Sequence, residues 1–515
     1  MRICLISREY PPDTGFGGIA TFTKHLAHGL KNLGHDVVVV ALAKDKAKVA
    51  DDDGIAVHRV EPYPFTSKLS ALGMCIPYSK YVLFSSTALW DKFAELHSVK
   101  RFDVVDTPEL LAEGIIPAVT QAVPQVIRLY TPHSKFIAEK LHNVVPSFDH
   151  QFVAMLERIA MLQADVLTSP SNDLAQFVAG DLGLPVERIQ IVRNPIDTSV
   201  FTPEGELALS KSDKLRIVFV GRLEGRKGIT YLVDAIPLVV AQYPNVEFVI
   251  IGDDTTTGEG MTSVLASLKK SLEASNCTKH VNFIDRISLD ELPNYYRSAD
   301  ISVVPSVYDN SPYTCLEAMA CGKPVIGTDA GGTKEYIEHG VSGLIIPACD
   351  ANALAQSCIE LLSNSGERKR LSDGARERAV KYFDRTEIAR QTVACYDLAT
   401  KLFNERKASE AARSLYHHDF RRATADAATI IDSFDKAIYD LLFQRSYRFR
   451  IAHWWRAIKA RPKLFGAKLL AKTSRRAFKI FGTKEENMPK MLTDWESSID
   501  SKEHEPLARK LTGKH

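Results

Sequence analysis

The chain has 515 residues, of which 45% are hydrophobic and 25% are charged. A single hydrophobic core stops growing at about 250–300 residues, so this length predicts more than one domain. The 65 Lys and Arg residues almost balance the 63 Asp and Glu residues, and the net charge of +2 argues against a surface devoted to nucleic acid.

The eight cysteines are scattered and form no Cys-x-x-Cys pair, which favours reduced thiols. No apolar run is long enough to predict a membrane-spanning helix. The N-terminus enters a strand directly, without the layout of a signal peptide. These features predict a cytoplasmic protein.

The first elements predict a parallel sheet. A strand at 2–7, a glycine-rich loop at 9–18, a helix at 19–33 and a Val-rich strand at 36–42 form a βαβ unit. Gly17 and Gly18 stand in the loop, where the backbone must turn sharply or approach a ligand closely. A glycine pair alone is a weak signal of function.

A later strand, expected at 126–129, leads into a segment that contains His133. A side chain at the carboxyl end of a parallel strand faces the ligand crevice of such sheets. By position alone, a histidine of this kind is more often structural than functional.

A second series of strands and helices begins with a strand at 215–220. Residues 221–228 then form a loop bounded by glycines, and a helix starts at Ile229. Basic residues in a loop that opens a helix suit a phosphate, because backbone N–H groups and positive charge converge there. Arg222 and Lys227 are the candidate phosphate ligands, and Arg226 is expected to be solvated.

The most informative stretch is residues 301–347, which predicts strand, loop, helix, strand, loop, helix and strand. Asp309 lies in the first loop, and Glu317 follows eight residues later inside the helix expected at 314–320. The helix N-terminus favours phosphate. Carboxylates beside it are well placed to accept hydrogen bonds from sugar hydroxyls. The stretch therefore predicts a site for a sugar joined to a nucleotide.

This ordered set of motifs resembles the retaining glycosyltransferases of family 4, whose signature is two acidic residues separated by seven. The family usually has Glu at both ends, and here Asp309 takes the first place. The resemblance covers about residues 1–405. It implies an α/β protein of the GT-B fold, with two Rossmann-like domains facing a cleft.

The resemblance also implies roles for individual residues. His133 and Asp309 would orient the donor sugar, Arg222 and Lys227 would hold the donor diphosphate, and Glu317 would hold the ribose hydroxyls. These catalytic and sugar-contacting residues belong to a wider expected donor site, which comprises Gly17, Gly18, Arg222, Lys227, Arg286, Ile287, Asp309, Asn310, Ser311, Pro312, Tyr313, Thr314 and Glu317. No metal and no cofactor are expected.

The expected domains are an N-terminal acceptor domain at 1–205, to which a crossing helix at 386–405 returns, and a nucleotide-sugar domain at 206–385. Residues 406–483 predict a basic helical extension, and 484–515 predict a disordered tail. The stretch 441–483 carries basic residues and no acidic ones. It suits either an anionic membrane surface or packing against protein.

The predicted function is transfer of a hexose from a UDP- or GDP-sugar to a hydroxyl acceptor, with retention of configuration. A glycan or lipid-linked acceptor in cell-surface polysaccharide or glycolipid assembly is expected, with the protein either free in the cytoplasm or peripheral on the inner face of the membrane. Two alternatives remain: a nucleotide-sugar epimerase of the GT-B fold, and a non-catalytic assembly subunit.

Overall fold

The computed structural model describes residues 1–15, 17–62, 77–140, 147–258 and 262–412. The described residues belong to one compact unit. The predictions for 413–515, including the basic stretch and the tail, lie outside the described residues. The helix predicted at 406–412 is present, but these residues end α15 (Arg385–Ala412) and do not start a separate extension.

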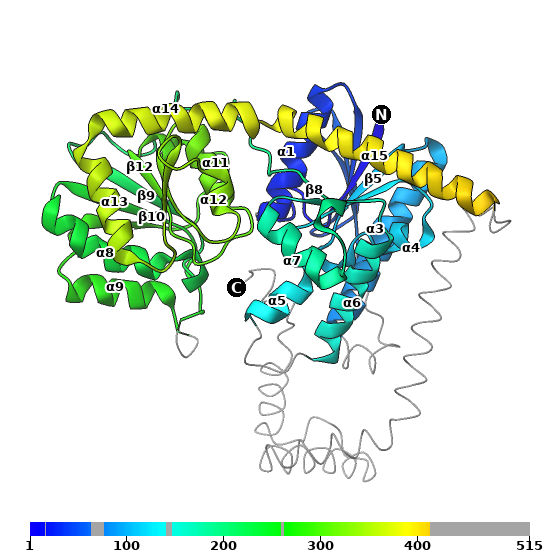
Figure 1. Cartoon of the computed structure of the whole chain (residues 1–515), viewed down its shortest axis with the longest axis horizontal. Coiled ribbons are helices and arrows are strands. Elements are labelled where there is room, and N and C mark those ends of the chain that lie inside the picture. The colour runs from blue at the N-terminus through cyan, green and yellow to red at the C-terminus, as the bar shows by residue number, and fades with distance from the viewer. Residues whose placement is uncertain (16, 63–76, 141–146, 259–261, 413–515) are drawn as a thin grey trace, which may run out of the picture. The chain divides into compact units, whose positions relative to one another are not determined.

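The first sheet runs in the order β3-β4-β2-β1-β5-β6-β7-β8. Figure 1 labels two of its strands, β5 and β8. All neighbours are parallel except the edge pair β3 and β4, which is antiparallel. The strands are β1 (Arg2–Ile6), β2 (Asp36–Leu42), β3 (Lys48–Asp52), β4 (Ile55–Val60), β5 (Val104–Pro108), β6 (Gln125–Arg128), β7 (Val166–Ser169) and β8 (Ile189–Ile191).

Alternate residues of these strands bury their side chains against different helix layers, as the period of two in a strand requires. Leu5 and Val39 pack with α1 and α15, whereas Ile6 and Val40 pack with α3, α6 and α7. The helices of this half are α1 (Gly18–Asn32), α3 (Pro77–Val99), α4 (Ile115–Thr120), α5 (His133–Lys140), α6 (Phe148–Gln163) and α7 (Asn172–Leu182), with short 3₁₀ turns at Leu110–Ala112 and Val186–Arg188.

The second sheet is parallel throughout, in the order β11-β10-β9-β12-β13-β14. Its strands are β9 (Leu215–Val220), β10 (Val246–Ile251), β11 (Val281–Ile284), β12 (Ile301–Val304), β13 (Val325–Thr328) and β14 (Gly343–Ile346). In chain order this is the 3-2-1-4-5-6 arrangement of a Rossmann fold, whose strand order reverses between β9 and β12.

Helices flank this sheet on both faces, and two separate apolar cores lie between sheet and helices. The helices of this half are α8 (Ile229–Gln242), α9 (Val264–Ala274), α10 (Leu292–Arg297), α11 (Tyr313–Ala320), α12 (Thr333–Tyr336), α13 (Ala351–Ser363) and α14 (Ser365–Tyr382), with 3₁₀ turns at Gly225–Lys227 and Thr278–His280. The predicted α/β class with two Rossmann-like sheets is confirmed.

Helix α15 follows α14 and returns to the first sheet, as expected of the crossing helix, but it begins at Arg385 and runs to Ala412. It packs closely on α1, where an ideal Cβ on Gly29 would lie 2.2 Å from the carbonyl oxygen of Arg385. Tyr396 donates a hydrogen bond of 2.6 Å to Asp106 on β5. The last described helix therefore covers one face of the first sheet.

Candidate functional site

The loops after β9 and β12 meet at the point where the second sheet reverses its strand order. Gly228, at φ +72°, ends the loop after β9, and an ideal Cβ there would lie 1.7 Å from the carbonyl oxygen of Pro305. Only glycine permits this approach. Ligands of open α/β sheets bind at such a switch point, beyond the carboxyl ends of the strands.

An ion pair joins the two loops. Nζ of Lys227 bonds Oδ2 of Asp309, which is only 8% exposed. Burial alone would raise the pKa of Asp309, but the charges of Lys227 and Arg226 outweigh it and hold that pKa below its usual value. Asp309 is therefore ionised at neutral pH.

Arg226 is not solvated as the sequence predicted. Its Nη2 donates to Glu224 Oε1 at 2.7 Å, and its Nη1 lies 3.8 Å from Asp309 Oδ2. The same Glu224 oxygen accepts a 3.1 Å hydrogen bond from Arg222, whose side chain stays more than half exposed. Glu224 therefore orients both arginines. The position of Glu224 between Arg222 and Arg226 in the sequence could have indicated this arrangement, because an acidic residue flanked by basic ones is a pattern that favours ion pairs.

Glu317 lies in α11 and is buried. Its Oε2 accepts a hydrogen bond of 2.9 Å from the hydroxyl of Tyr296. Burial raises the pKa of Glu317 to about 7, against the lowering effects of the Tyr296 hydrogen bond and the Lys227 charge. Tyr296 is fully buried in the core, and it also holds this carboxylate.

The segment between the two acids connects to the first half of the chain. Nδ2 of Asn310 donates to the carbonyl oxygen of Tyr130 at 2.6 Å and to Oγ1 of Thr131 at 2.7 Å. Ser311 donates its backbone N–H to Asp309 at 3.3 Å. The loop with Asp309 is thus bonded to the loop that leads to His133.

The rest of this segment begins α11. Pro312 is the N-cap residue, and Tyr313 and Thr314 are the first two helical residues. The carbonyl of Thr314 accepts a 3.3 Å hydrogen bond from Tyr296. The Tyr313 ring lies against Gly18, where an ideal Cβ would be 3.7 Å from it. This contact brings the glycine loop beside the helix N-terminus.

The remaining predicted donor residues are less constrained. Gly17 is the N-cap of α1, and nothing lies within 4 Å of an ideal Cβ there. Arg286 is exposed, with Nη1 3.4 Å from Asp253 Oδ2. Ile287 is half-buried against the core that contains Tyr296. Both residues lie in the loop that follows β11.

His133 is the first residue of α5 and is 3% exposed. Its backbone N–H donates to Glu157 Oε2 at 2.5 Å, and its Nε2 lies 2.7 Å from Nδ1 of His150. Burial, with a smaller effect of His150, lowers the pKa of His133 to about 4. The imidazole is therefore neutral at neutral pH. The sequence did not reveal His150 or Glu157 as its partners.

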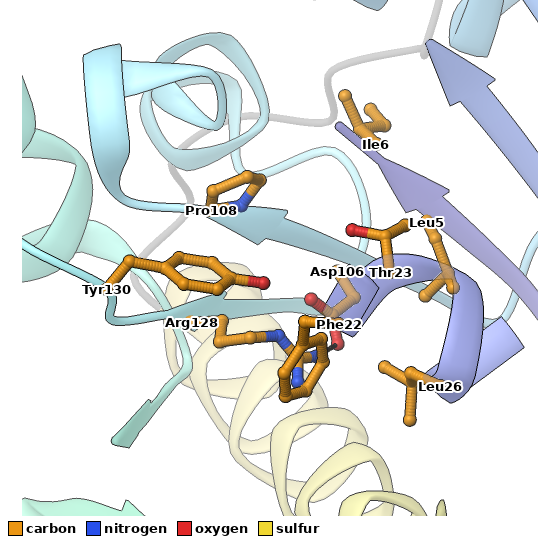
Figure 2. Close-up of a pocket in the computed structure, with 9 residues that line it drawn as sticks. All are labelled: Leu5, Ile6, Phe22, Thr23, Leu26, Asp106, Pro108, Arg128 and Tyr130. Carbon is orange, nitrogen blue, oxygen red and sulfur yellow. Dashed lines mark hydrogen bonds and ion pairs between the residues drawn. The ribbon is translucent and has the colours of Figure 1, made fainter. Parts of the chain in front are cut away.

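A small pocket in the first half of the chain is lined by a buried ion pair that stabilises the fold. Figure 2 shows Arg128 and Asp106 among its lining residues, and these two side chains form a buried ion pair. The Arg128 guanidinium lies 3.8 Å from the ring centre of Phe22. Because Tyr396 of α15 donates to the same carboxylate, the pair anchors α15 to the sheet.

The described ranges contain neither a candidate metal centre nor a candidate membrane-spanning helix. None of the residues in those ranges forms a group of three or more His, Cys, Asp or Glu side chains arranged to hold a metal ion. Within the same part of the chain, no helix has both the length and the apolar character needed to cross a membrane.

The sequence matches two family profiles along most of its length. Residues 16–200 match "Glycosyltransferase Family 4", and residues 206–378 match "Glycosyl transferases group 1". The chain therefore belongs to the group 1 glycosyl transferases of family 4, and its fold is GT-B. The general class of activity, glycosyl transfer, follows from this membership.

Known proteins resemble the chain over the same region. An uncharacterised glycosyltransferase of Methanocaldococcus jannaschii is 27% identical over 411 residues, which cover 78% of this chain and 99% of the relative. The fold is similar to sucrose-phosphate synthase from Thermosynechococcus elongatus, with a TM-score of 0.61, 22% identity and coverage of 78% and 99%. It is also similar to HepE of Anabaena, solved with UDP-glucose, with a TM-score of 0.56, 18% identity and coverage of 77% and 99%.

Proposed function

We propose that this chain transfers a hexose from a nucleoside diphosphate sugar, a UDP- or GDP-sugar, to a hydroxyl acceptor, with retention of configuration and without a metal ion. The observation that carries the proposal is the ion pair between the partly exposed Lys227 and the buried Asp309 at the switch point of the second sheet. The pair places a cation and a carboxylate beside the N-terminus of α11. A diphosphate would be bound by the cation and by the N-terminus of α11, and a sugar would be bound by the carboxylate.

Charge develops on the diphosphate as the bond to the sugar breaks. Lys227, Arg222 and the backbone N–H groups at the start of α11 would stabilise that charge, and such groups act most strongly where water is excluded. Arg222 is held by Glu224 while its side chain remains accessible, which suits a residue that must reach a ligand. Gly17 and Gly18 would border the diphosphate from the first half of the chain.

The sugar and the nucleoside would be held by the remaining groups. Asp309 and His133 would orient the sugar, and Glu317 would accept hydrogen bonds from the ribose hydroxyls. Residues 286–287 would lie beside the base. By the family resemblance, the acceptor attacks from the face that the diphosphate leaves, and the departing phosphate takes the acceptor's proton.

The shorter Asp309 in place of Glu is compatible with this scheme. Its carboxylate is ionised and already bonded to Lys227, so it forms part of a charged site without an added methylene. A cell-surface polysaccharide or glycolipid acceptor, and peripheral attachment to an inner membrane face through 441–483, remain part of the proposal and rest on the sequence alone.

The test is a thermal-shift measurement with UDP, GDP, ADP and CMP, followed by donor assays with sugars of the diphosphate that binds. A ligand at about 100 times its dissociation constant stabilises the folded state by about 2.7 kcal/mol. A shift with one diphosphate, lost in Lys227→Ala, is the expected result. No shift with any of the four, or full transfer activity in Lys227→Ala, would overturn the assignment. A product that remains nucleotide-linked would identify an epimerase instead.

A further inference from the structure

The two histidines His133 and His150 form a pair that the proposed function leaves unexplained. Nε2 of His133 and Nδ1 of His150 are 2.7 Å apart, the ring centres are 5.0 Å apart, and the ring planes differ by 17°. The separation of the ring centres is close to the length of the bond plus the two ring radii. The rings therefore meet edge to edge, in a geometry that a shared hydrogen bond requires.

Helix α6 supplies both groups that hold His133. Glu157 accepts the backbone N–H of His133 at 2.5 Å, and its other oxygen accepts the N–H of Leu111 at 2.8 Å. His150 and Glu157 are seven residues apart, so they lie on one face of the helix. One face of α6 thus fixes both the backbone and the ring of His133.

Aromatic side chains restrict the ring further. The Tyr78 ring centre lies 5.3 Å from that of His133, and the Phe136 ring is stacked on it at 5.4 Å. These contacts fix the plane of the imidazole but do not choose which nitrogen carries the proton. Only the bond to His150 makes that choice, because within the described residues Nδ1 of His133 has no recorded hydrogen bond.

When both imidazoles of the pair are neutral, the hydrogen bond contains one proton, and two arrangements are then possible. Either both rings carry their protons on Nε2, and His133 donates, or both carry them on Nδ1, and His150 donates. The Nε2–H form is the one that neutral histidine favours in water. The first arrangement therefore satisfies the bond with both rings in their favoured form.

We propose that His150 is a positioning residue that holds His133 in the Nε2–H tautomer, which leaves Nδ1 of His133 as a hydrogen-bond acceptor for a hydroxyl of the donor sugar. The proposal rests on the proposed function, in which His133 contacts that sugar. It adds a partner from α6, 17 residues further along the chain, and assigns a direction to the contact.

Two variants separate hydrogen bonding from packing. His150→Phe keeps a ring but removes the acceptor, and His150→Asn keeps an acceptor oxygen near the place of Nδ1. We would record long-range ¹H–¹⁵N spectra of the full chain with labelled histidine, and identify the His133 signals by their loss in His133→Gln. The wild type and His150→Asn should show an unprotonated Nδ1 and a protonated Nε2. His150→Phe should show averaged or reversed signals.

Kinetics supply the second readout. With the donor sugar that the wild type uses, His150→Phe should lower kcat by about tenfold, as expected for one lost hydrogen bond, and His150→Asn should recover most of it. The thermal shift with the free diphosphate should be the same in all three proteins, which also checks that each is folded.

The outcomes distinguish the two proposals. Unchanged His133 signals and an unchanged kcat in His150→Phe would overturn the role of His150, even if the diphosphate binds. A protonated Nδ1 in the wild type would overturn the assigned direction. A wild type that binds no nucleoside diphosphate would overturn the proposed function, whatever the tautomer of His133.

Discussion

Lys227 and Asp309 lie on different loops of the second sheet, 82 residues apart in sequence, and are bonded to each other in a largely buried site. Each therefore compensates for the burial of the other. Removing one partner leaves an uncompensated charge, so the pair matters for stability as well as for any ligand.

Lys227→Ala should lower the turnover number by about 10²–10³-fold, the usual cost of removing one group that stabilises developing charge. The diphosphate-induced thermal shift should shrink as well. Lys211→Ala, at an exposed position between the two sheets, provides the control. Turnover and thermal shift measured on both variants decide the matter, and equal losses in the two would point to a non-specific effect of charge.

Glu317→Gln should alter how stability depends on pH. The folded-state pKa of Glu317 is raised from 4.5 to about 7, so the folded state binds more protons than the unfolded state between these values. The contribution of Glu317 to stability therefore falls as the pH rises through that window and is level above it. Melting temperatures should fall less steeply in Glu317→Gln than in the wild type from about pH 5 to about pH 8.

The control for that experiment is Glu360→Gln, at an exposed position of α13. Its melting curve should run parallel to that of the wild type. If the melting curve of Glu317→Gln also runs parallel to that of the wild type, Glu317 is already ionised at pH 5. That result would contradict a raised pKa for Glu317. A second readout is diphosphate affinity, which should rise through about pH 7 in the wild type as the carboxylate ionises and becomes a better acceptor for ribose hydroxyls.

Asp106→Ala should destabilise the protein by about 3–5 kcal/mol, because it leaves Arg128 buried without its partner carboxylate. The double variant Asp106→Leu with Arg128→Met should recover much of that loss, since it removes both charges and fills the space. Thermal melts followed by circular dichroism measure both. A single variant as stable as the double one would show that the ion pair does not anchor the first half.

Gly228→Ala and Gly17→Ala form a matched pair. At Gly228 a side chain meets the Pro305 carbonyl and requires a left-handed backbone, so a melting temperature lower by several degrees is expected. At Gly17 nothing is near, so stability should change by less than about 0.5 kcal/mol. If the glycine loop borders the diphosphate, Gly17→Ala should still raise KM for the donor. Equal stability of the two variants would contradict the close packing at Gly228.

The sequence predicted the second half well because its strands are short β-branched runs with clear boundaries. The expected strand at 215–220 coincides with β9. Strand β3 went unnoticed because it is a polar edge strand, and only packing against β4 defines it. Helix α6 begins at Phe148 after a Ser147 cap, whose side chain accepts the backbone N–H of His150.

The candidate site likewise contains residues that the sequence predicted and residues that only the structure revealed. Motifs indicated Lys227, Asp309 and Glu317, because each follows an apolar parallel strand whose carboxyl end lies at the ligand-binding edge of the sheet. The partners of Glu317 and His133, which are Tyr296 and His150, are 21 and 17 residues from the side chains they bond. No local pattern links residues at such separations, so only the folded structure identifies these partners.

Helix α15 also sets the order in which this protein can be completed during synthesis. Ile388, Tyr396 and Ala399 cover apolar side chains of a sheet whose last strand ends at Ile191. At about 5–20 residues per second, the ribosome needs roughly ten seconds or more to add the intervening chain. Throughout that interval the earliest-made sheet lacks its final apolar cover, so the nascent first half is the stage at which the protein most needs protection from aggregation.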